Sequence, residues 1–201
     1  MPENTKRSTS VERVTRETSI RLTLTVDGSG RTAIRTPIPF FTHMLEAFCR
    51  HGNLDVRLEA EGDVAIDQHH TVEDVGLVLG QALREALGDR QGVRRMASVF
   101  VPMDEALAFC AVDLSGRPFC AFDAAFDKQH QGGLELDLVA EFFRALATES
   151  RATWHLKVYA GMNEHHKVEA LFKAAGRALA DAAGRETARA GTVPSTKGTL
   201  E

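Results

Sequence analysis

The chain has 201 residues, 43% of them hydrophobic, and a formal net charge of −4 at pH 7. This length and composition suffice to bury a core, while the interleaved charges give no basic stripe and argue against nucleic-acid binding. No run approaches the roughly 18 apolar residues of a membrane span, and no secretory signal opens the chain, so we expect a cytoplasmic protein without a membrane partner.

The first half of the chain is predicted to alternate strands and helices. Residues 10–36 are rich in Thr, Val and Ile and break at the Gly-rich stretch 27–30, which predicts a β-hairpin. Apolar residues at helical spacing predict a helix over 40–50, and alternating residues predict a strand over 54–61. A second helix is predicted to end at Gly88, because glycine is typical of helix C-termini.

The second half repeats this order, with a turn at Ser115–Pro118 between its first strand segments. Its predicted elements are strands at 98–113 and 118–126, a helix at 136–148, a strand at 153–160 and a helix at 164–183. Internal repeats at about residues 10–90 and 95–184 therefore predict one α+β domain over 1–201, an internally duplicated fold with pseudo-two-fold symmetry and helices packed on one side of the sheet. Residues 185–201 form a polar tail, either disordered or a capping loop.

The three cysteines, Cys49, Cys110 and Cys120, are too widely spaced for a metal-binding CxxC pair. Each lies among apolar residues, so we expect buried thiols in a reducing compartment. A metal site in this chain would therefore be built from histidine and carboxylate groups rather than from thiolates.

The pattern HHxxE occurs twice, at His69–Glu73 and at His165–Glu169, each time at the start of a predicted helix. Residues three and four apart share a helix face, so each glutamate can reach one of its own histidines. The adjacent histidines lie about 100° apart around the axis, so one helix can offer them to two metals, or to a metal and a substrate. A solvated polar helix start is the alternative for a single copy, and the second copy argues against it.

Placing the two motifs in register brings His43 opposite Glu141 and raises the number of candidate ligands to eight. Two metals with four protein ligands each would use all eight and leave positions open for water or substrate, which indicates catalysis. Imidazole and carboxylate suit Mn, Fe, Zn or Ni, and an open octahedral shell favours Mn or Fe. The candidate metal ligands are His43, His69, His70, Glu73, Glu141, His165, His166 and Glu169.

Other polar residues give weaker indications of a ligand. Arg95 and Arg117 could clamp a phosphate with their guanidinium groups, and the segment Ser195–Gly198 combines hydroxyls, an ammonium and a flexible glycine. Taken singly, each arginine is typical of a solvated charge, as is Lys173 on the last helix. His51 is either a charge at a helix C-terminus or a ligand.

Seven motifs occur in order along the chain. They are Arg16-Glu17-Thr18, Phe41-Thr42-His43-Met44-Leu45, His51-Gly52, Asp67-Gln68-His69-His70-Thr71-Val72-Glu73-Asp74, Asp113-Leu114-Ser115-Gly116-Arg117-Pro118, Asn163-Glu164-His165-His166-Lys167-Val168-Glu169-Ala170 and Ser195-Thr196-Lys197-Gly198. With this series the chain closely resembles imidazoleglycerol-phosphate dehydratase, the lyase of histidine biosynthesis, from Val14 to Leu200.

The resemblance implies a fold of two ββαβα-like halves and a homo-oligomer of 24 subunits with cubic symmetry. It implies two Mn²⁺ ions per active site, held by all eight candidate ligands at a site that neighbouring subunits complete. It also implies a small phosphorylated imidazole substrate, with residues 185–201 as a substrate-binding tail. The implied substrate contacts are Glu17, His51, Arg95, Arg117, Lys173, Ser195 and Lys197.

The chain departs from the family pattern at three positions. Ala47 stands where a glutamine near the phosphate is usual, and Thr42 and Gln68 stand where aspartates are usual. The metal ligands are unaffected, so these departures bear on the phosphate pocket. Loss of the amide at Ala47 is either compensated by cationic groups such as Arg95 and Arg117 or weakens phosphate binding.

The implied reaction removes water from D-erythro-imidazole-glycerol phosphate to give imidazole-acetol phosphate. The carbon that loses its proton has no neighbouring carbonyl, so the imidazole ring must supply the electrons. Metal binding to both ring nitrogens would give a metal-bound imidazolate that expels the hydroxyl and forms a diazafulvene-like intermediate. We expect Glu17 to be the catalytic base, with Glu169 or a metal-bound water as the alternatives.

Two other classes of function remain open from the residues alone. The same ligands on iron could serve a di-metal oxidoreductase, although a ferritin-like bundle would not place this much of the chain in strands. A non-catalytic metal-storage shell could also use a duplicated site. The separate arginines and the Ser-Thr-Lys segment of the tail favour a phosphorylated ligand, and therefore the lyase.

Overall fold

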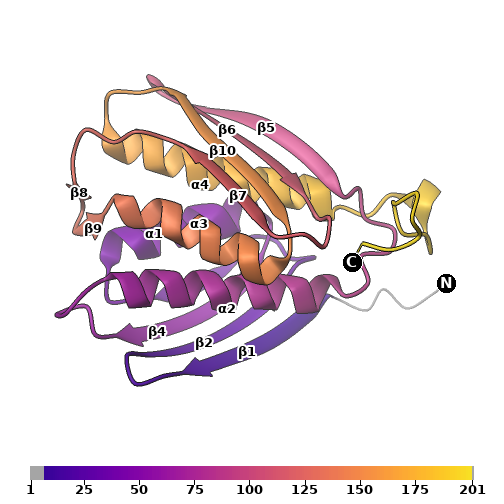
Figure 1. Cartoon of the computed structure of the whole chain (residues 1–201), viewed down its shortest axis with the longest axis horizontal. Coiled ribbons are helices and arrows are strands. Elements are labelled where there is room, and N and C mark those ends of the chain that lie inside the picture. Colours follow the sequence, from indigo (N-terminus) through magenta and orange to yellow (C-terminus); the bar gives the residue numbers. More distant parts are fainter. Residues whose placement is uncertain (1–6, 201) are drawn as a thin grey trace.

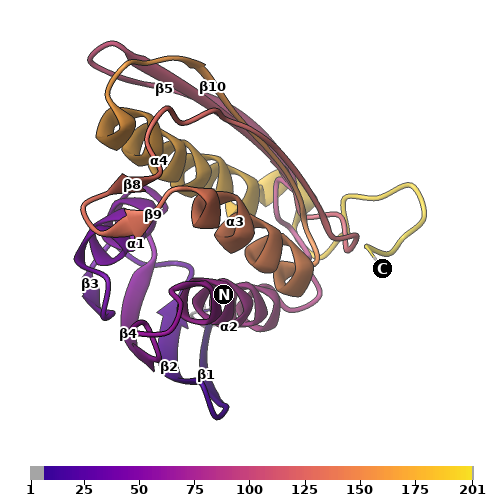
Figure 2. The same cartoon turned by 60° about the vertical axis from the view of Figure 1, so that its left-hand side comes forward.

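Two four-stranded sheets enclose a layer of four α-helices in the computed structural model, which describes residues 7–200 (Figure 1, Figure 2). Residues 1–6 and Glu201, the ends of the predicted domain, lie outside the described residues. The predicted α+β class and duplication are confirmed, with one sheet from each half of the chain. Within residues 7–200, no helix is both long and apolar enough to cross a membrane.

The first half of the chain folds into one sheet and two helices. Its elements are β1 (Ser8–Val14), β2 (Thr18–Thr25), β3 (Thr32–Arg35), α1 (Pro39–His51), β4 (Asp55–Gly62) and α2 (His69–Leu87). The strand order is β1-β2-β4-β3, with β2 antiparallel to both of its neighbours. β3 and β4 are parallel, because α1 connects them and returns the chain to the same edge.

The second half repeats this arrangement. Its elements are β5 (Met96–Met103), β6 (Ala106–Asp113), β7 (Phe119–Asp123), α3 (Asp137–Ser150), β10 (Thr153–Ala160) and α4 (Glu164–Ala183). The strand order β5-β6-β10-β7 matches the first sheet element by element, and β7 and β10 are again parallel. Two small additions are the hairpin of β8 (His130–Gln131) and β9 (Leu134–Glu135) and the short helix η1 (Thr187–Arg189).

The helices form the middle layer of the molecule (Figure 2). α2 lies on β1 and β2, and α4 lies on β5 and β6. α1 packs along α4 and α2 packs along α3, so each helix pair joins the two halves of the chain. Four buried rings fill the centre with neighbouring centroids 5.0–5.5 Å apart: Phe41, Phe142, Phe143 and Phe172.

Two glycines at equivalent positions allow these helix pairs to approach closely. A Cβ atom on Gly176 of α4 would overlap the carbonyl oxygen of Phe48 in α1. A Cβ atom on Gly80 of α2 would lie only 2.7 Å from the carbonyl oxygen of Leu146 in α3. Both glycines follow the first histidine of their HHxxE motif by eleven residues, so the close contact is duplicated together with the fold.

The predicted hairpin at residues 10–36 is wrong in the position of its turn. The chain reverses between β1 and β2, where the Thr15 hydroxyl accepts hydrogen bonds from the backbone N–H groups of Glu17 and Thr18 at 3.1 and 2.9 Å. This side-chain bond closes the turn without a glycine. The Gly-rich stretch 27–30 instead leads from β2 to β3, which pairs with β4.

Two strand assignments differ from the prediction, and the tail takes one of its two predicted forms. The predicted strand at 98–113 is two strands, β5 and β6, which turn at Asp104, a residue with a left-handed φ of 49°. β7 pairs in parallel with β10 rather than with β6, its neighbour in sequence. The described tail forms a capping loop, because Gly92 exchanges backbone hydrogen bonds with Glu186 and Thr192. The four predicted helices are confirmed to within a few residues.

The three thiols are unpaired and shielded from solvent. Cys49 and Cys110 are buried and Cys120 is half-buried, which confirms their prediction as core residues. Burial raises the pKa of all three thiols, to about 11 for Cys120. They are therefore protonated at neutral pH and are poor metal ligands.

Replacing Gly176 with alanine should lower the free energy of unfolding by about 1–3 kcal/mol, because the added methyl group forces α1 and α4 apart. The higher helix propensity of alanine offsets no more than about 1 kcal/mol of this cost. Chemical denaturation at one fixed protein concentration measures the change. Arg177→Ala, at an exposed position one residue further along α4, is the matched control. An unchanged or raised denaturation midpoint in Gly176→Ala would contradict the role assigned to this contact.

Candidate metal centre

The two HHxxE motifs lie at the N-terminal ends of α2 and α4, at the same end of the molecule (Figure 1). Each helix start is stabilised by a preceding side chain. Asn163 accepts a hydrogen bond from the backbone N–H of His165 at 2.9 Å, and Asp67 accepts one from the N–H of His69 at 2.8 Å. These bonds satisfy otherwise unpaired N–H groups and fix both first histidines in equivalent positions.

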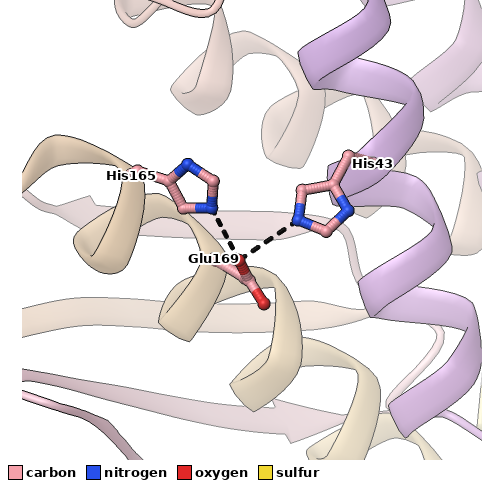
Figure 3. Close-up of side chains that lie close together, drawn as sticks. All are labelled: His43, His165 and Glu169. Carbon is pink, nitrogen blue, oxygen red and sulfur yellow. Dashed lines mark hydrogen bonds and ion pairs between the residues drawn. The ribbon is translucent and has the colours of Figure 1, made fainter.

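The first donor group consists of His43, His165 and Glu169, and it joins α1 to α4 (Figure 3). Glu169 Oε2 lies 3.2 Å from His43 Nε2 and 2.8 Å from His165 Nε2. The Phe40 ring packs edge-on against the His165 ring, with 5.1 Å between centroids, and restricts its rotation. One ligand atom of each residue lies within 4.8 Å of the other two, so a single divalent cation could bind all three.

The second donor group consists of His69, Glu73 and Glu141, and it joins α2 to α3. Its ligand atoms also lie within 4.8 Å of one another, with 3.8 Å between His69 Nε2 and Glu73 Oε2. Glu141 in addition pairs with Arg144 at 2.8 Å. The duplication relates the two groups, and their imidazole and carboxylate donors fit the metals predicted from the sequence. Their assignment as metal ligands stays a prediction.

His70 and His166 face away from both donor groups, as expected for neighbours about 100° apart on a helix. His70 Nδ1 lies 3.2 Å from each carboxylate oxygen of Asp63 and 3.8 Å from Glu17. His166 Nδ1 lies 2.8 Å from Glu105 Oε2. In one chain, the eight predicted ligands therefore form two groups of three and two separate histidines.

The charges around the first donor group favour an ionised carboxylate. Glu169 Oε1 lies 2.7 Å from Lys173 Nζ. Burial raises the pKa of Glu169, but the hydrogen bonds from Lys173 and His165 outweigh burial and lower that pKa to about 2. At neutral pH Glu169 is therefore a carboxylate, the form that binds metal.

Hydrogen bonding also changes the pKa of the two separate histidines. The hydrogen bond with Asp63 raises the pKa of His70, and the bond with Glu105 raises the pKa of His166. The His166 bond in turn lowers the pKa of Glu105 to about 2. Each second histidine therefore has a carboxylate group beside its Nδ1 atom.

Two of the predicted substrate residues lie near the first donor group. Lys173 contacts Glu169 directly, and the positive charge of Lys173 acts electrostatically on His51. Burial lowers the pKa of His51, and the positive charges of Lys173 and Arg177 lower it further. Neutral imidazole is therefore the expected form of His51 at pH 7.

Glu17 lies beside His70, and the other four predicted substrate residues lie beyond the far end of α4. The Arg95 backbone N–H donates to the carbonyl of Ala182 at 2.8 Å, and its guanidinium donates to both oxygens of Asp113 and to the carbonyl of Pro194. The helix from His165 to Ala182 is about 25 Å long. Three further predicted residues lie in this region, in the loop after β6 and in the tail: Arg117, Ser195 and Lys197. One chain therefore does not bring these residues to the donor groups.

Asp63 and Glu105 are candidate functional residues that the sequence did not single out. Each backs one of the second histidines through Nδ1. Extending the repeat into the hairpin turns would have found Glu105, because it immediately precedes β6 as Glu17 immediately precedes β2. Misplacement of both turns hid this equivalence.

Comparison with known proteins gives one consistent family. Residues 36–179 match the family model described as imidazoleglycerol-phosphate dehydratase. The imidazoleglycerol-phosphate dehydratase of Symbiobacterium thermophilum is 55% identical over 190 residues, which cover 94% of this chain and 91% of that protein. That of a Roseiflexus species is 52% identical over the whole of both chains. The crystal structure of the Staphylococcus aureus protein of that name superposes with a TM-score of 0.81 at 37% identity, covering 89% of this chain and 99% of the other.

Acid should destabilise the metal-free protein through Glu169. Its pKa is about 2 in the folded protein against an ordinary value of 4.5, so its contribution to stability is complete above pH 4.5 and is lost as the pH falls towards 2. Glu169→Gln should therefore show a smaller drop in melting temperature across this interval than the wild type. Thermal unfolding with EDTA at a series of pH values measures the difference.

Glu73→Gln serves as the control, because Glu73 is the equivalent residue in the other donor group and its side chain is 40% exposed, against 10% for Glu169. Solvent screens its ion pair, so its acid dependence should stay near that of the wild type. Identical acid dependence in Glu169→Gln and the wild type would show that Glu169 does not carry this stability.

Proposed function

The chain belongs to the imidazoleglycerol-phosphate dehydratase family, and we propose that it dehydrates D-erythro-imidazole-glycerol phosphate to imidazole-acetol phosphate in L-histidine biosynthesis. It is an enzyme, and the family is one of lyases. The observation that carries the proposed chemistry is the pair of donor groups related by the duplication. Two matched cation sites suit a substrate whose imidazole ring has a nitrogen atom to offer to each of them.

We propose that the active site holds two Mn²⁺ ions. The first and second donor groups supply imidazole nitrogen and carboxylate oxygen without thiolate, which suits Mn²⁺. His70 and His166 face away from the donor groups of their own chain, so we assign them to complete the ligand sets of neighbouring subunits. When bound, the metal ions supply Lewis-acid stabilisation of negative charge on the substrate ring.

Glu17 is the proposed catalytic base, because its backbone is fixed while its carboxylate is accessible. Its N–H donates to Thr15 Oγ1 at 3.1 Å, and its carbonyl accepts from the Asp63 N–H at 3.1 Å. Its side chain is 54% exposed, and its carboxylate lies 3.8 Å from His70 Nδ1. A substrate bound beside His70 would therefore lie within reach of an exposed carboxylate. Loss of the hydroxyl as water would leave a diazafulvene-like species, and Glu17 would then remove the proton from the neighbouring carbon to give the enol.

Glu169 is less suited to proton transfer. Its side chain is 10% exposed, and both of its oxygens already have partners. Oε1 pairs with Lys173, and Oε2 contacts His43 and His165. A base must exchange protons with the substrate, so we assign Glu169 to metal binding and Glu17 to the chemistry.

Phosphate binding is assigned to the residues that lie beyond the far end of α4. Charge-assisted hydrogen bonds from guanidinium and ammonium groups are the strongest interactions available for a phosphate. One guanidinium nitrogen of Arg95 is bound to the tail and two to Asp113, so Arg95 orients the tail as well as contributing charge. The proposed phosphate ligands are Arg95, Arg117, Ser195 and Lys197, with Glu17, His51 and Lys173 as further substrate contacts.

A shared active site follows from the length of α4. About 25 Å of helix separates His165 from the region of Arg95, too far for one small substrate to reach both in a single chain. Residues of another subunit must therefore complete each site, in the proposed assembly of 24 subunits. The buried position of Ala47 in α1 leaves compensation for the family's usual glutamine to these cationic groups.

The outer face of the second sheet supports self-association. Four large apolar side chains on it are more than half exposed: Met96, Phe100, Phe119 and Tyr159. The rings of Phe100 and Tyr159 contact each other, with 5.6 Å between centroids. The outer face of the first sheet instead carries exposed ion pairs, such as Arg21 with Glu12 and Arg57 with Glu59. An apolar patch of this kind typically marks a protein interface, and we assign it to a second copy of this chain.

We propose that the enzyme works in the cytoplasm on a diffusible substrate. Its three unpaired thiols suit a reducing compartment. The assigned partners are the phosphorylated imidazole substrate and further copies of the chain, with neither nucleic acid nor membrane. The weakly acidic overall charge agrees with this assignment.

Removal of divalent metal should abolish dehydration, and Mn²⁺ should restore it. The expected loss follows from the need to stabilise negative charge on the ring, which the protein's own groups do not provide. Formation of the ketone from imidazole-glycerol phosphate is followed with chelated protein, before and after addition of Mn²⁺. Full activity in protein shown by elemental analysis to lack divalent metal would overturn the proposal.

Glu17→Gln is the matched variant for this assay, because it keeps the shape of the side chain and removes only the base. It should bind as much Mn²⁺ as the wild type and should lower kcat by about 100-fold or more, the range of general base catalysis. Loss of bound Mn²⁺ in this variant would instead identify Glu17 as a metal ligand.

A further inference from the structure

The two hairpin turns that face the second histidines carry equivalent glutamates with different environments. Glu17 immediately precedes β2, and Glu105 immediately precedes β6. Given the metal centre proposed above, we propose that Glu105 is a positioning residue, which fixes the tautomer of His166 so that Nε2 is available to the metal. Asp63 performs the same task for His70, and this division of tasks leaves Glu17 free for catalysis.

Glu105 is held by three hydrogen bonds that use both of its carboxylate oxygens. Oε1 accepts from the backbone N–H groups of Met162 and Asn163 at 3.1 and 2.8 Å. Oε2 lies 2.8 Å from His166 Nδ1. Glu105 therefore connects the β5–β6 turn to the first residues of α4, and it holds the imidazole of His166 against the same carboxylate.

The direction of the His166 bond determines which ring nitrogen can bind a metal. A carboxylate can only accept a hydrogen bond, so His166 Nδ1 must carry the proton. The neutral ring then has its lone pair on Nε2, the atom that points away from Glu105. Metal-binding histidines commonly rely on a hydrogen bond of this kind at the other ring nitrogen.

In the first half of the chain, a different residue occupies this role. Asp63 follows the last residue of β4, and both of its oxygens lie 3.2 Å from His70 Nδ1. Glu17 lies further away, at 3.8 Å. His70 therefore has its tautomer fixed without any contribution from Glu17.

No aspartate could take this place in the second half. The residue that follows β10 is Gly161, with φ of 150°. A Cβ atom there would lie 2.7 Å from Lys167 Cγ and 3.1 Å from Ala106 Cβ. Because this position leaves no room for a side chain, the turn residue Glu105 accepts the hydrogen bond from His166 Nδ1 instead. In the first half, the residue after the strand supports the histidine; in the second half, the turn residue does so.

The test compares Mn²⁺ affinity of metal-depleted protein among variants of these two positions. In Glu105→Gln, the amide oxygen can still accept from Met162 and Asn163, but the NH₂ group then faces His166 Nδ1 and can only donate. This reverses the tautomer and places a proton on Nε2. The Mn²⁺ dissociation constant, measured by titration calorimetry, should rise by about 10–100-fold, the usual effect of losing such a partner. Asp63→Asn should cause a similar rise.

Glu105→Asp separates tautomer control from a purely structural role. Aspartate is shorter and loses packing, yet it still accepts from Nδ1; glutamine keeps the length but loses the second acceptor. We expect Mn²⁺ binding to be weaker in Glu105→Gln than in Glu105→Asp, whereas a structural role predicts the opposite order. Asp123→Asn, the same chemical change at a side chain that is 72% exposed and pairs with Lys157, should bind Mn²⁺ within about 3-fold of the wild type.

The remaining outcomes distinguish a positioning role of Glu105 from a catalytic role and from failure of the proposed metal centre. Wild-type Mn²⁺ affinity in Glu105→Gln would overturn the inference, and a collapse of kcat without a change in affinity would make Glu105 a catalytic residue. If the wild type itself binds no Mn²⁺, the proposed metal centre fails, and this result is distinct from a failure of the positioning role. Thermal unfolding with EDTA identifies any variant that does not fold, and the order of Mn²⁺ affinities among Asp63→Asn, Asp123→Asn and Glu105→Asp then tests the positioning role.

Discussion

The close approach of α1 to α4, and of α2 to α3, is the constraint on which the rest of the structure depends. Each donor group takes residues from both helices of a pair, so its geometry exists only if the helices are near each other. Gly176 and Gly80 make this possible, because the facing carbonyl of Phe48 or Leu146 leaves no room for a side chain. Helix packing at this distance brings together imidazole and carboxylate groups that could bind a divalent cation.

The duplication gives both halves of the chain the same fold, and different residues at equivalent positions give the halves different proposed roles. The first donor group has His43 where the second has Glu141, so two equivalent positions offer ligands of different charge. Equivalent turns hold Glu17, which is accessible, and Glu105, which is bound on both oxygens. A symmetric fold in this way provides an asymmetric environment, as a reaction requires when one carbon loses a hydroxyl and its neighbour a proton.

Much of the site could be predicted from the sequence because helices are local structures. The spacing within HHxxE fixes which residues share a helix face. The register of the two motifs adds His43 and Glu141 to the predicted metal ligands. Hairpin turns were less predictable, since Thr15 closes one with its hydroxyl and Asp104 adopts a left-handed φ in the other. Without those turns, the pairing of Glu105 with His166 could not be anticipated. Nor does sequence spacing reveal that α4 holds Arg95 about 25 Å from the donor groups.

We propose that donor groups and phosphate-binding residues come together in one active site only between subunits. Native mass spectrometry of Mn²⁺-loaded protein tests it most directly, because one spectrum reports both the number of chains and the number of metal ions. We expect an assembly of 24 chains of 22.0 kDa with two Mn²⁺ per chain, and loss of tightly bound Mn²⁺ from any dissociated monomer. A monomer that retains two Mn²⁺ ions and full dehydratase activity would contradict it.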